Sequence, residues 1–325
     1  MAVRILRIFF ISMALLGGQQ AFSANEGLYP DIPQKVQIIV PLAAGNPVDG
    51  GARALAVGLA EETGKSFIVI NKPGAGGTIG TAEAARGPAD GSVLLITSGG
   101  HTTNPGLYRN LPYDTVADFK PISLLSRSQG FVLLVHKDSP FKTLQELLDA
   151  ARKEPESLTY GSFGTGNTTH IVGALFAKHA DVQLLHVPYA NPVNDFLGGH
   201  VDMIFIGTSS ARPLIESGRV RGLAVSSERR LDSWPDMPTF RENGLEEAEV
   251  AAYTGLYAPA GIPEKIVAQI HAAIKIAVTG EAYQNLLKVT GSDVVVSTPE
   301  EFGPYVEKEV ALYKKLLPEL GIKLD

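Results

Sequence analysis

A glycine-rich segment directly after an apolar run constrains the fold of this chain most strongly. The run FIVI at residues 67–70 predicts a buried strand, and NKPGAGGTIG at residues 71–80 follows it without a break. The small residues that come next predict a helix packed closely on a sheet. Glycines at such a junction let backbone N–H groups approach a ligand, and a helix N-terminus carries partial positive charge. The segment therefore predicts a strand–turn–helix unit with an anion site at its turn.

The alternation of strands and helices continues along the chain. A second glycine-rich turn, GSFGTGNTTH at residues 161–170, opens another helix. Further helices are predicted at residues 49–63, 143–153, 263–278 and 299–317. Strands are predicted at residues 37–42, 67–70, 93–97, 131–136, 158–161, 182–187, 201–206 and 222–226. This order is typical of an α/β protein with mostly parallel sheets flanked by helices.

The first 23 residues have the features of a secretory signal peptide. Arg4 and Arg7 precede a short apolar run, and small residues follow at Ala21 and Ser23. The run is shorter than the ~20 residues that a helix needs to span a bilayer. We therefore expect export, to a bacterial periplasm. Because the chain has no Cys, we expect neither a lipid-modified cysteine nor a disulfide.

Charge and length narrow the classes of function. Without Arg4 and Arg7, 26 basic residues stand against 34 acidic ones. This balance argues against binding of nucleic acid, which needs a basic face. A mature chain of about 300 residues exceeds the size at which single cores usually stop growing, so two lobes are expected. We expect lobe 1 to comprise residues 25–127 plus 228–325, and lobe 2 residues 128–227.

The expected ligand site is a cleft between these lobes. In open α/β sheets, ligands bind beyond the carboxyl ends of the strands. Four loops are expected there, at residues 43–49, 74–80, 98–104 and 162–170, and Tyr189 and residues 207–209 would extend the wall of the second lobe. A cleft with glycine-rich turns on both walls suits a small anion better than a long polymer.

Two nucleotide motifs are incomplete. GKS at residues 64–66 looks like the end of a phosphate-binding loop, but it lies between a helix and a strand, the reverse of the required order. Gly74 and Gly76 begin a dinucleotide pattern whose third glycine comes one residue late, at Gly80. The His residues show no metal-ligand spacing. We expect neither a metal nor a cofactor.

An exported hydrolase or isomerase remains the alternative. Ser162 and His170 share one loop, and Asp195 or Asp202 would complete a triad. The chain has no Gly-x-Ser-x-Gly elbow, and a Ser near a helix start is more often a cap or a ligand donor.

Short motifs recur along the whole mature chain. They are VPLAAG (40–45), NKPGAGG (71–77), PADG (88–91), NPGLY (104–108), LPYD (111–114), DFKP (118–121), YGSFGTG (160–166), HVPY (186–189), LGGHVD (197–202), PDMPT (235–239), GLYAPAG (255–261) and TPEEF (298–302). In this order they resemble the tripartite tricarboxylate transporter receptors, also called Bug proteins. The resemblance implies a two-lobed periplasmic binding protein of type II-like fold and no enzyme activity. Such a protein closes on a small carboxylate and delivers it to membrane permease subunits. We also expect a monomer.

The resemblance further implies that the two glycine-rich loops grip the carboxylate. Together with the loops described above, it predicts ligand contacts from Ala44, Asn46, Asp49, Gly76, Gly77, Ser98, His101 and Asn104 in the first lobe, and from Ser162, Gly164, Thr165, Gly166, Asn167, His170, Tyr189, Gly207 and Thr208 in the second. Asn46 stands where the family usually has glycine. For Asp49 two roles stay open: it caps a helix, or it pairs with an amino or hydroxyl group of the ligand.

Overall fold

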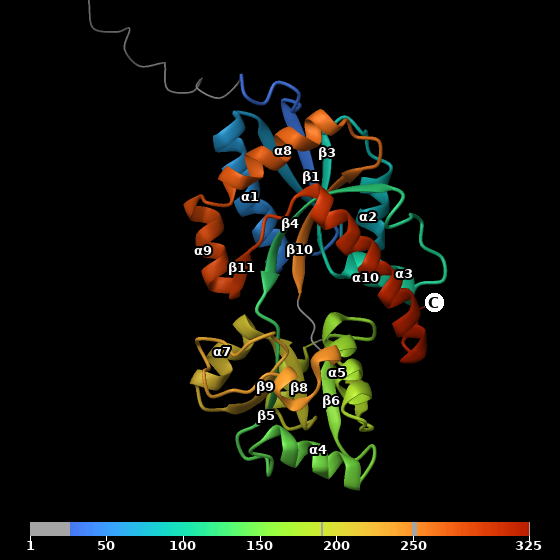
Figure 1. Ribbon diagram of the computed structural model, residues 1–325, viewed down its shortest axis with the longest axis vertical. Helices are drawn as coiled ribbons and strands as arrows, with labels where there is room; N and C mark the ends of the chain where they lie inside the picture. Colours follow the sequence, from blue (N-terminus) through green and yellow to red (C-terminus); the bar gives the residue numbers. More distant parts are fainter. Residues whose placement is uncertain (1–26, 190, 249–251, 325) are drawn as a thin grey trace, which may run out of the picture.

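The protein consists of two α/β lobes that the chain joins by crossing between them twice (Figure 1). The structure is a computed structural model that describes residues 27–189, 191–248 and 252–324. The expected signal peptide, residues 1–23, lies outside this part of the chain. Within it, none of the helices is both long enough and apolar enough to cross a membrane.

The first lobe is built on a six-stranded sheet in the order β11-β4-β10-β3-β1-β2. Its strands are β1 (Lys35–Val40), β2 (Ser66–Asn71), β3 (Val93–Ser98), β4 (Phe119–Ser128), β10 (Tyr253–Pro259) and β11 (Ser292–Val294). β1 pairs in parallel with β2 and β3, whereas β10 is antiparallel to β3 and β4, and β11 to β4. The expectation of a mostly parallel sheet is corrected here. The chain leaves the lobe along β4 and returns along the adjacent β10, so these neighbours run in opposite directions.

Helices cover both faces of the first sheet. One face packs against α1 (Pro47–Thr63), α8 (Glu264–Ala277) and α9 (Glu281–Thr290); the other packs against α2 (Thr78–Ala85), α3 (Gly100–Leu107) and α10 (Pro299–Glu319). In β3, Leu94 and Ile96 belong to the core on the first face, and Val93 and Leu95 to the core on the second. An apolar run without polar alternation is what a strand buried on both faces requires.

The second lobe has a five-stranded sheet in the order β7-β6-β8-β5-β9. The strands are β5 (Phe131–His136), β6 (Thr159–Ser162), β7 (Leu185–Pro188), β8 (Met203–Gly207) and β9 (Val220–Val225). β6 is parallel to β7 and β8, and β5 is antiparallel to β8 and β9, so this sheet is also mixed. Its faces carry α4 (Leu144–Lys153) and α5 (Thr168–His179) on one side and α6 (Pro192–Leu197) and α7 (Thr208–Glu216) on the other.

The return of the chain to the first lobe comes later than the expected position near residue 228. Leu231 belongs to a buried cluster of the second lobe, and Phe240 packs against Phe176 of α5 and Phe205 of β8. These apolar side chains hold the segment at residues 231–240 on the second sheet. At the crossing itself, the Ser128 N–H donates to the Ala252 carbonyl at 2.7 Å, and the Ala252 N–H donates to Ser128 Oγ at 2.9 Å. The two crossing segments therefore lie side by side.

The C-terminal end of α10 forms a further contact between the lobes. Tyr313, Leu317 and Ile322 share a buried cluster with residues of α5, and Lys178 Nζ lies 2.9 Å from Glu319 Oε2. The last described residues, which we call the C-terminal tail (residues 320–324), continue along the boundary.

Candidate functional site

The carboxyl ends of the parallel strands in both lobes point to the boundary between the lobes. In the first lobe, Ser98 at the end of β3 pairs with Thr254, next to the crossing. In the second lobe, Gly207 ends β8 opposite Phe131, and the Thr208 N–H donates to the carbonyl of Gly130 in the crossing at 3.2 Å. The two glycine-rich turns follow β2 and β6, so both lie at this boundary.

The first glycine-rich turn has a backbone shape that ordinary residues rarely adopt. From Gly74 to Gly77 the φ angles are +134°, +45°, +63° and +90°. A Cβ on Gly76 would lie 2.6 Å from the hydroxyl of Tyr108, so glycine is required there by contact as well as by φ. No side chain caps α2. The Gly77 N–H donates to the Gly74 carbonyl and the Thr78 N–H to the Ala75 carbonyl, so only the N–H groups that follow them in α2 are left for a ligand or for solvent.

Asn104 supports this turn from inside the first lobe. Its side-chain amide donates to the Gly76 carbonyl and reaches the Tyr113 hydroxyl, both at 3.3 Å. The residue is buried, so the structure favours a positioning role over direct contact with a ligand. Ser98 is only partly buried at the end of β3 and remains available at the boundary.

Asn46 caps α1. Its Oδ1 accepts the N–H of Val48 at 2.8 Å and that of Asp49 at 3.2 Å, and its amide also bonds the carbonyl of Ala43. The cap role considered for Asp49 thus belongs to Asn46. This arrangement leaves Ala44 exposed in the loop before the cap.

Asp49 is a buried carboxylate with all of its partners inside the first lobe. It accepts hydrogen bonds from the Gly45 N–H (2.9 Å), Arg53 Nε (3.1 Å) and Asn71 Nδ2 (2.9 Å). Burial on its own would raise the pKa of Asp49, but these hydrogen bonds and the charge of Arg53 outweigh it and hold the pKa below its usual value. The residue fixes the first loop to the end of β2. The i,i+4 spacing could have indicated Arg53, but no local signal marks Asn71.

His101 lies in the aromatic core of the first lobe rather than at the boundary. Its ring packs against Tyr257 at 4.6 Å, Phe119 at 4.9 Å and Tyr113 at 6.0 Å between ring centres. Neither ring nitrogen has a hydrogen-bond partner among the described residues. Burial lowers the pKa of His101 to about 3, so the ring is neutral at pH 7. This placement does not support the expected ligand contact.

The second glycine-rich turn joins β6 to α5. Gly164 and Gly166 have φ angles of +103° and +77°, and Asn167 caps α5 by accepting the Thr169 N–H at 3.0 Å. A Cβ on Gly166 would lie 3.1 Å from side chains of Leu107 and Leu324. The turn is thus packed directly against the first lobe and the C-terminal tail, while the neighbouring Thr165 is exposed.

Ser162 pairs with a histidine that the sequence pattern did not single out. Ser162 Oγ lies 2.6 Å from His186 Nε2, and the His186 ring stacks on that of His170 at 3.7 Å. His170 Nδ1 accepts the Gly166 N–H at 3.0 Å. Burial, with a smaller effect of His186, lowers the pKa of His170 to about 4; burial also lowers that of His186. Both rings are therefore neutral at pH 7.

This arrangement differs from the hydrolase alternative. The hydroxyl of Ser162 is fully buried, and its partner is His186 rather than His170. Asp202 accepts the N–H and the hydroxyl of Thr159, each at 2.7 Å, at the opposite end of β6. The Asp202 carboxylate therefore lies at the start of β6, whereas Ser162 lies at its end. His186 reaches Ser162 because β7 is the parallel neighbour of β6, a pairing that no local sequence signal indicates.

The remaining predicted residues also reach the boundary. The Tyr189 N–H donates to the Ser162 carbonyl at 2.9 Å, which holds Tyr189 beside the second turn. Thr208 faces the end of α9, where a Cβ on Gly291 would lie 3.6 Å from Thr208 Oγ1. Across the described ranges, no group of three or more His, Asp or Glu side chains is placed to hold a metal ion.

Known proteins are similar to this chain over most of its length. The family described as tripartite tricarboxylate transporter family receptor matches residues 51–322. A UPF0065 protein from the tcbD-tcbE intergenic region of a Pseudomonas species is 36% identical over 88% of this chain and 86% of its own. The solved periplasmic binding protein BugD is 32% identical, with a TM-score of 0.75 over 89% of this chain and 99% of its own. R. palustris Rpa4515, solved with adipate, is 30% identical, with a TM-score of 0.77 over 89% and 98%.

Proposed function

The chain belongs to the family of tripartite tricarboxylate transporter receptors, and on that premise we propose that it captures a small carboxylate between its lobes. The bound acid is then handed to the membrane subunits of a tripartite transporter. The features of a signal peptide at residues 1–23, together with relatives solved as periplasmic proteins, support a periplasmic location. The protein acts there as a monomer.

One observation carries the proposal: two glycine-rich turns, one from each lobe, lie at the same boundary. Each opens a helix, and α2 has no side-chain cap. Because the Gly77 and Thr78 N–H groups donate to the Gly74 and Ala75 carbonyls, we expect the N–H groups that follow them in α2 to bind the carboxylate, without competition from a side chain. A carboxylate bound there would accept hydrogen bonds at the N-terminus of α2, as a capping side chain does.

Backbone donors are sufficient for the affinity that such a receptor needs. A hydrogen bond to a charged group contributes about 1.5–3 kcal/mol, and micromolar binding requires about 8 kcal/mol. Three or four such bonds reach that range. His170 and His186 are neutral at pH 7, so the second lobe offers dipoles rather than a positive charge. Side chains farther along the cleft, such as Tyr189, would select among acids.

The relatives support a carboxylate as the ligand class. R. palustris Rpa4515 was solved with adipate, a dicarboxylate. Because the turns recognise a carboxylate through the backbone, we infer that the same grip serves in this chain.

The proposal is tested by a thermal-shift screen of the mature protein against mono-, di- and tricarboxylates, with amines and neutral sugars as controls. A ligand at 100 times its Kd should add about 2.7 kcal/mol to the free energy of unfolding. We expect a rise in Tm for a group of related acids, and recovery of the acid unchanged by mass spectrometry. A shift given only by sugars or amines, or conversion of the acid, would contradict the proposal.

A matched pair of variants assigns the effect to the first turn. Gly76→Ala places a Cβ against the Tyr108 hydroxyl and should weaken acid binding at least tenfold. Tyr108→Phe removes that oxygen, so the double variant should recover part of the affinity. If wild type and Gly76→Ala bound the acid with equal affinity, the first glycine-rich turn would not be part of the ligand site.

A further inference from the structure

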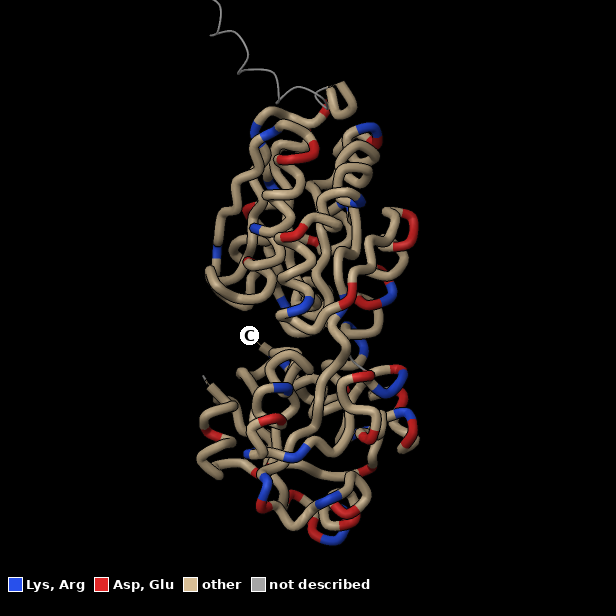
Figure 2. The backbone as a smooth tube through the Cα atoms, turned by 90° about the vertical axis from the view of Figure 1, so that its left-hand side faces the viewer, with Lys and Arg blue, Asp and Glu red and all other residues tan. Residues whose placement is uncertain are grey.

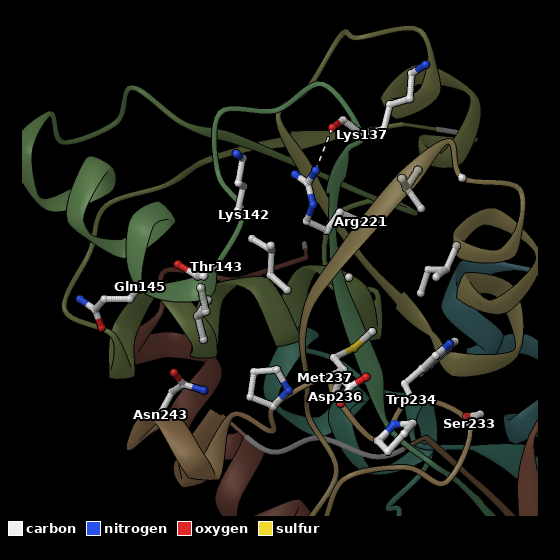
Figure 3. Close-up of a pocket in the computed structure, with 18 residues that line it drawn as sticks. Lys137, Lys142, Thr143, Gln145, Arg221, Ser233, Trp234, Asp236, Met237 and Asn243 are labelled. Carbon is white, nitrogen blue, oxygen red and sulfur yellow. Dashed lines mark hydrogen bonds between the residues drawn. The ribbon is translucent and has the colours of Figure 1, made fainter.

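A groove of about 710 Å³ opens on the second lobe, away from the two glycine-rich turns (Figure 3). It lies between the start of α4, the strand β9 and the segment from Ser233 to Pro238. None of the residues expected to hold the carboxylate lines it. Nothing in the proposed function so far uses this groove.

The floor of the groove is the free edge of a sheet. β9 is the last strand of its sheet: it pairs with β5, and among the described residues its only other bridge is at its end, between Val225 and Thr239. The residues from Val220 to Leu223 all line the groove, although successive side chains of a strand point to opposite faces. Consecutive residues reach a single groove only along the edge of the strand. This part of β9 therefore presents its edge to the groove.

The hydrogen-bond pattern shows which backbone groups this edge offers. Lys137 N–H donates to the Arg219 carbonyl at 3.2 Å, and bonded positions alternate along an antiparallel pair. Arg221 is thus the next residue bonded to β5, so the N–H and C=O of Val220 and the N–H of Gly222 point outward, just before the register shift that follows Gly222. Farther along, the Val225 N–H donates to the Pro238 carbonyl at 3.0 Å, so that end of the edge is covered.

The walls of the groove carry positive charge. Lys137, Lys142 and Arg221 line it, against the single carboxylate of Asp236. Arg221 donates to the carbonyls of Phe141 (2.9 Å) and Lys137 (3.2 Å), so its guanidinium is held in place by neutral acceptors, and it forms no ion pair with an acid of the described ranges. The whole chain has more acidic than basic residues, and both kinds are scattered over both lobes (Figure 2). The local charge of the groove is therefore opposite in sign to that of the protein.

The opposite wall is apolar. Trp234 and Met237 lie across the groove from Lys142 and Arg221 (Figure 3). Met237 also covers Gly222, where a Cβ would lie 2.3 Å from its terminal methyl group. An open strand edge, a cationic wall and an apolar wall together match an extended segment that alternates acidic and apolar residues.

We propose that this groove docks an extended acidic segment of the membrane partner, which adds to β9 as a further strand. The inference rests on the proposed function, because a receptor must engage a partner to hand over its ligand. Main-chain hydrogen bonds to Val220 and Gly222 set the register of the docked segment. The positive charges of the groove select a segment with acidic side chains.

Trp234 is the only tryptophan of the chain, so its fluorescence reports on this groove. The probe is an acetylated and amidated hexapeptide, Asp-Val-Glu-Val-Asp-Val, titrated into the mature protein at low salt. We expect saturable change in Trp234 emission that weakens as salt is raised. Two matched peptides serve as controls: one with Lys in place of each acidic residue, and one N-methylated at alternate positions. Neither should bind, because one has the wrong charge and the other cannot pair with β9.

Variants of Lys137 and Lys142 test whether the positively charged wall of the groove binds the acidic peptide. Lys142→Glu and Lys137→Glu should each weaken the acidic peptide at least fivefold, and the double variant more. Lys153→Glu, at the other end of α4 and outside the groove, is the matched control and should bind as wild type. All variants should keep the thermal shift given by the carboxylate ligand, which separates failure of docking from failure of the proposed function.

Several results would overturn the proposal. Equal binding of the acidic, basic and N-methylated peptides would do so, as would an unchanged affinity in the double lysine variant. A response to succinate or citrate but not to the peptide would instead make the groove a small-anion site. A change in emission with protein concentration alone would indicate a second copy of this chain as the occupant.

Discussion

Asp49 accepts hydrogen bonds from Gly45, Arg53 and Asn71, so one carboxylate connects the first loop, α1 and the end of β2. If the carboxylate were removed, the Gly45 N–H would lose its partner, whereas Arg53 would keep its bond to Asn71 Oδ1 and Asn71 its bond to the Leu42 carbonyl. The residue therefore acts on the candidate site through the position of the loop. Arg53 is half-exposed and can turn to solvent, whereas the Gly45 N–H is fixed by the backbone.

Asp49→Asn should lower the free energy of unfolding by about 1–3 kcal/mol at pH 7, because an amide cannot accept from all three donors. The folded pKa of Asp49 lies below its unfolded value, so its contribution is present above about pH 4 and is lost as pH falls through the folded pKa. Urea unfolding at pH 7 and pH 3 should therefore show a smaller difference from wild type at pH 3. Binding of amine-bearing and plain acids should weaken equally. A selective loss for amines would show direct contact instead.

Both ring nitrogens of His101 lack a hydrogen-bond partner in the part of the chain that the structure describes, and the ring titrates near pH 6.5 once unfolded. Its folded pKa of about 3 means that stability is lost as pH falls from about 6.5 toward 3. His101→Phe should therefore raise the free energy of unfolding by about 1–3 kcal/mol at pH 5, by less at pH 8, and leave acid binding unchanged. The comparison is His170→Phe, which deprives the Gly166 N–H of its acceptor and should destabilise. If His101→Phe weakened acid binding, His101 would have to be counted among the ligand-binding residues.

At the scale of elements, the sequence predicted those strands that consist of a continuous apolar run or precede a glycine-rich turn. The strand at residues 131–136 matches β5, and the helix expected at residues 143–153 matches α4, which the capping box of Thr143 and Glu146 opens. β4 and β10 were missed, because their role depends on pairing with each other across more than 120 positions. The same limit applies to the site: Ser162 meets His186 through the pairing of two strands, and no spacing in the sequence reveals it.

The C-terminal tail is an element whose role also arises from tertiary contact. The Leu324 N–H donates to the Leu107 carbonyl at 2.8 Å, and a Cβ on Gly166 would lie 3.1 Å from the Leu324 side chain. The tail is thus part of the surface against which the second turn rests.

Ending the chain at Gly321 should lower the free energy of unfolding by about 2–4 kcal/mol, since buried Ile322 is lost with Leu324. It should also weaken acid binding, because the second turn loses a packing partner. Calorimetry and titration of the truncated protein provide the measurements. Lys323→Ala is the control and should resemble wild type. Full affinity in the truncated protein would show that the tail supports stability alone.

At the scale of the whole molecule, capture by a two-lobed receptor requires the lobes to move. A Cβ on Gly291 would lie 3.6 Å from the Cβ of Ser209 in the other lobe, within the range of disulfides. Because the chain has no Cys, Ser209→Cys with Gly291→Cys would form a unique cross-link.

In the oxidised double variant we expect association and dissociation of the acid to slow at least tenfold, as the lobes are held in one arrangement. Reduction should restore both rates. Stopped-flow measurements with each single variant as control test this. Unchanged exchange in the oxidised protein would mean that the acid enters without movement at this boundary.

The hydrogen bonds between Ser128 and Ala252 also have an evolutionary consequence. Because entry and exit of the second lobe are adjacent, that lobe is topologically an insertion into the first, and the two halves of the cleft can be inherited separately. Chimeras that exchange residues 129–251 between relatives would combine one carboxylate grip with a new opposite wall. Such a graft must carry a matching C-terminal tail, because that segment packs on the exchanged lobe. New specificity could then arise by recombination at a single pair of joints.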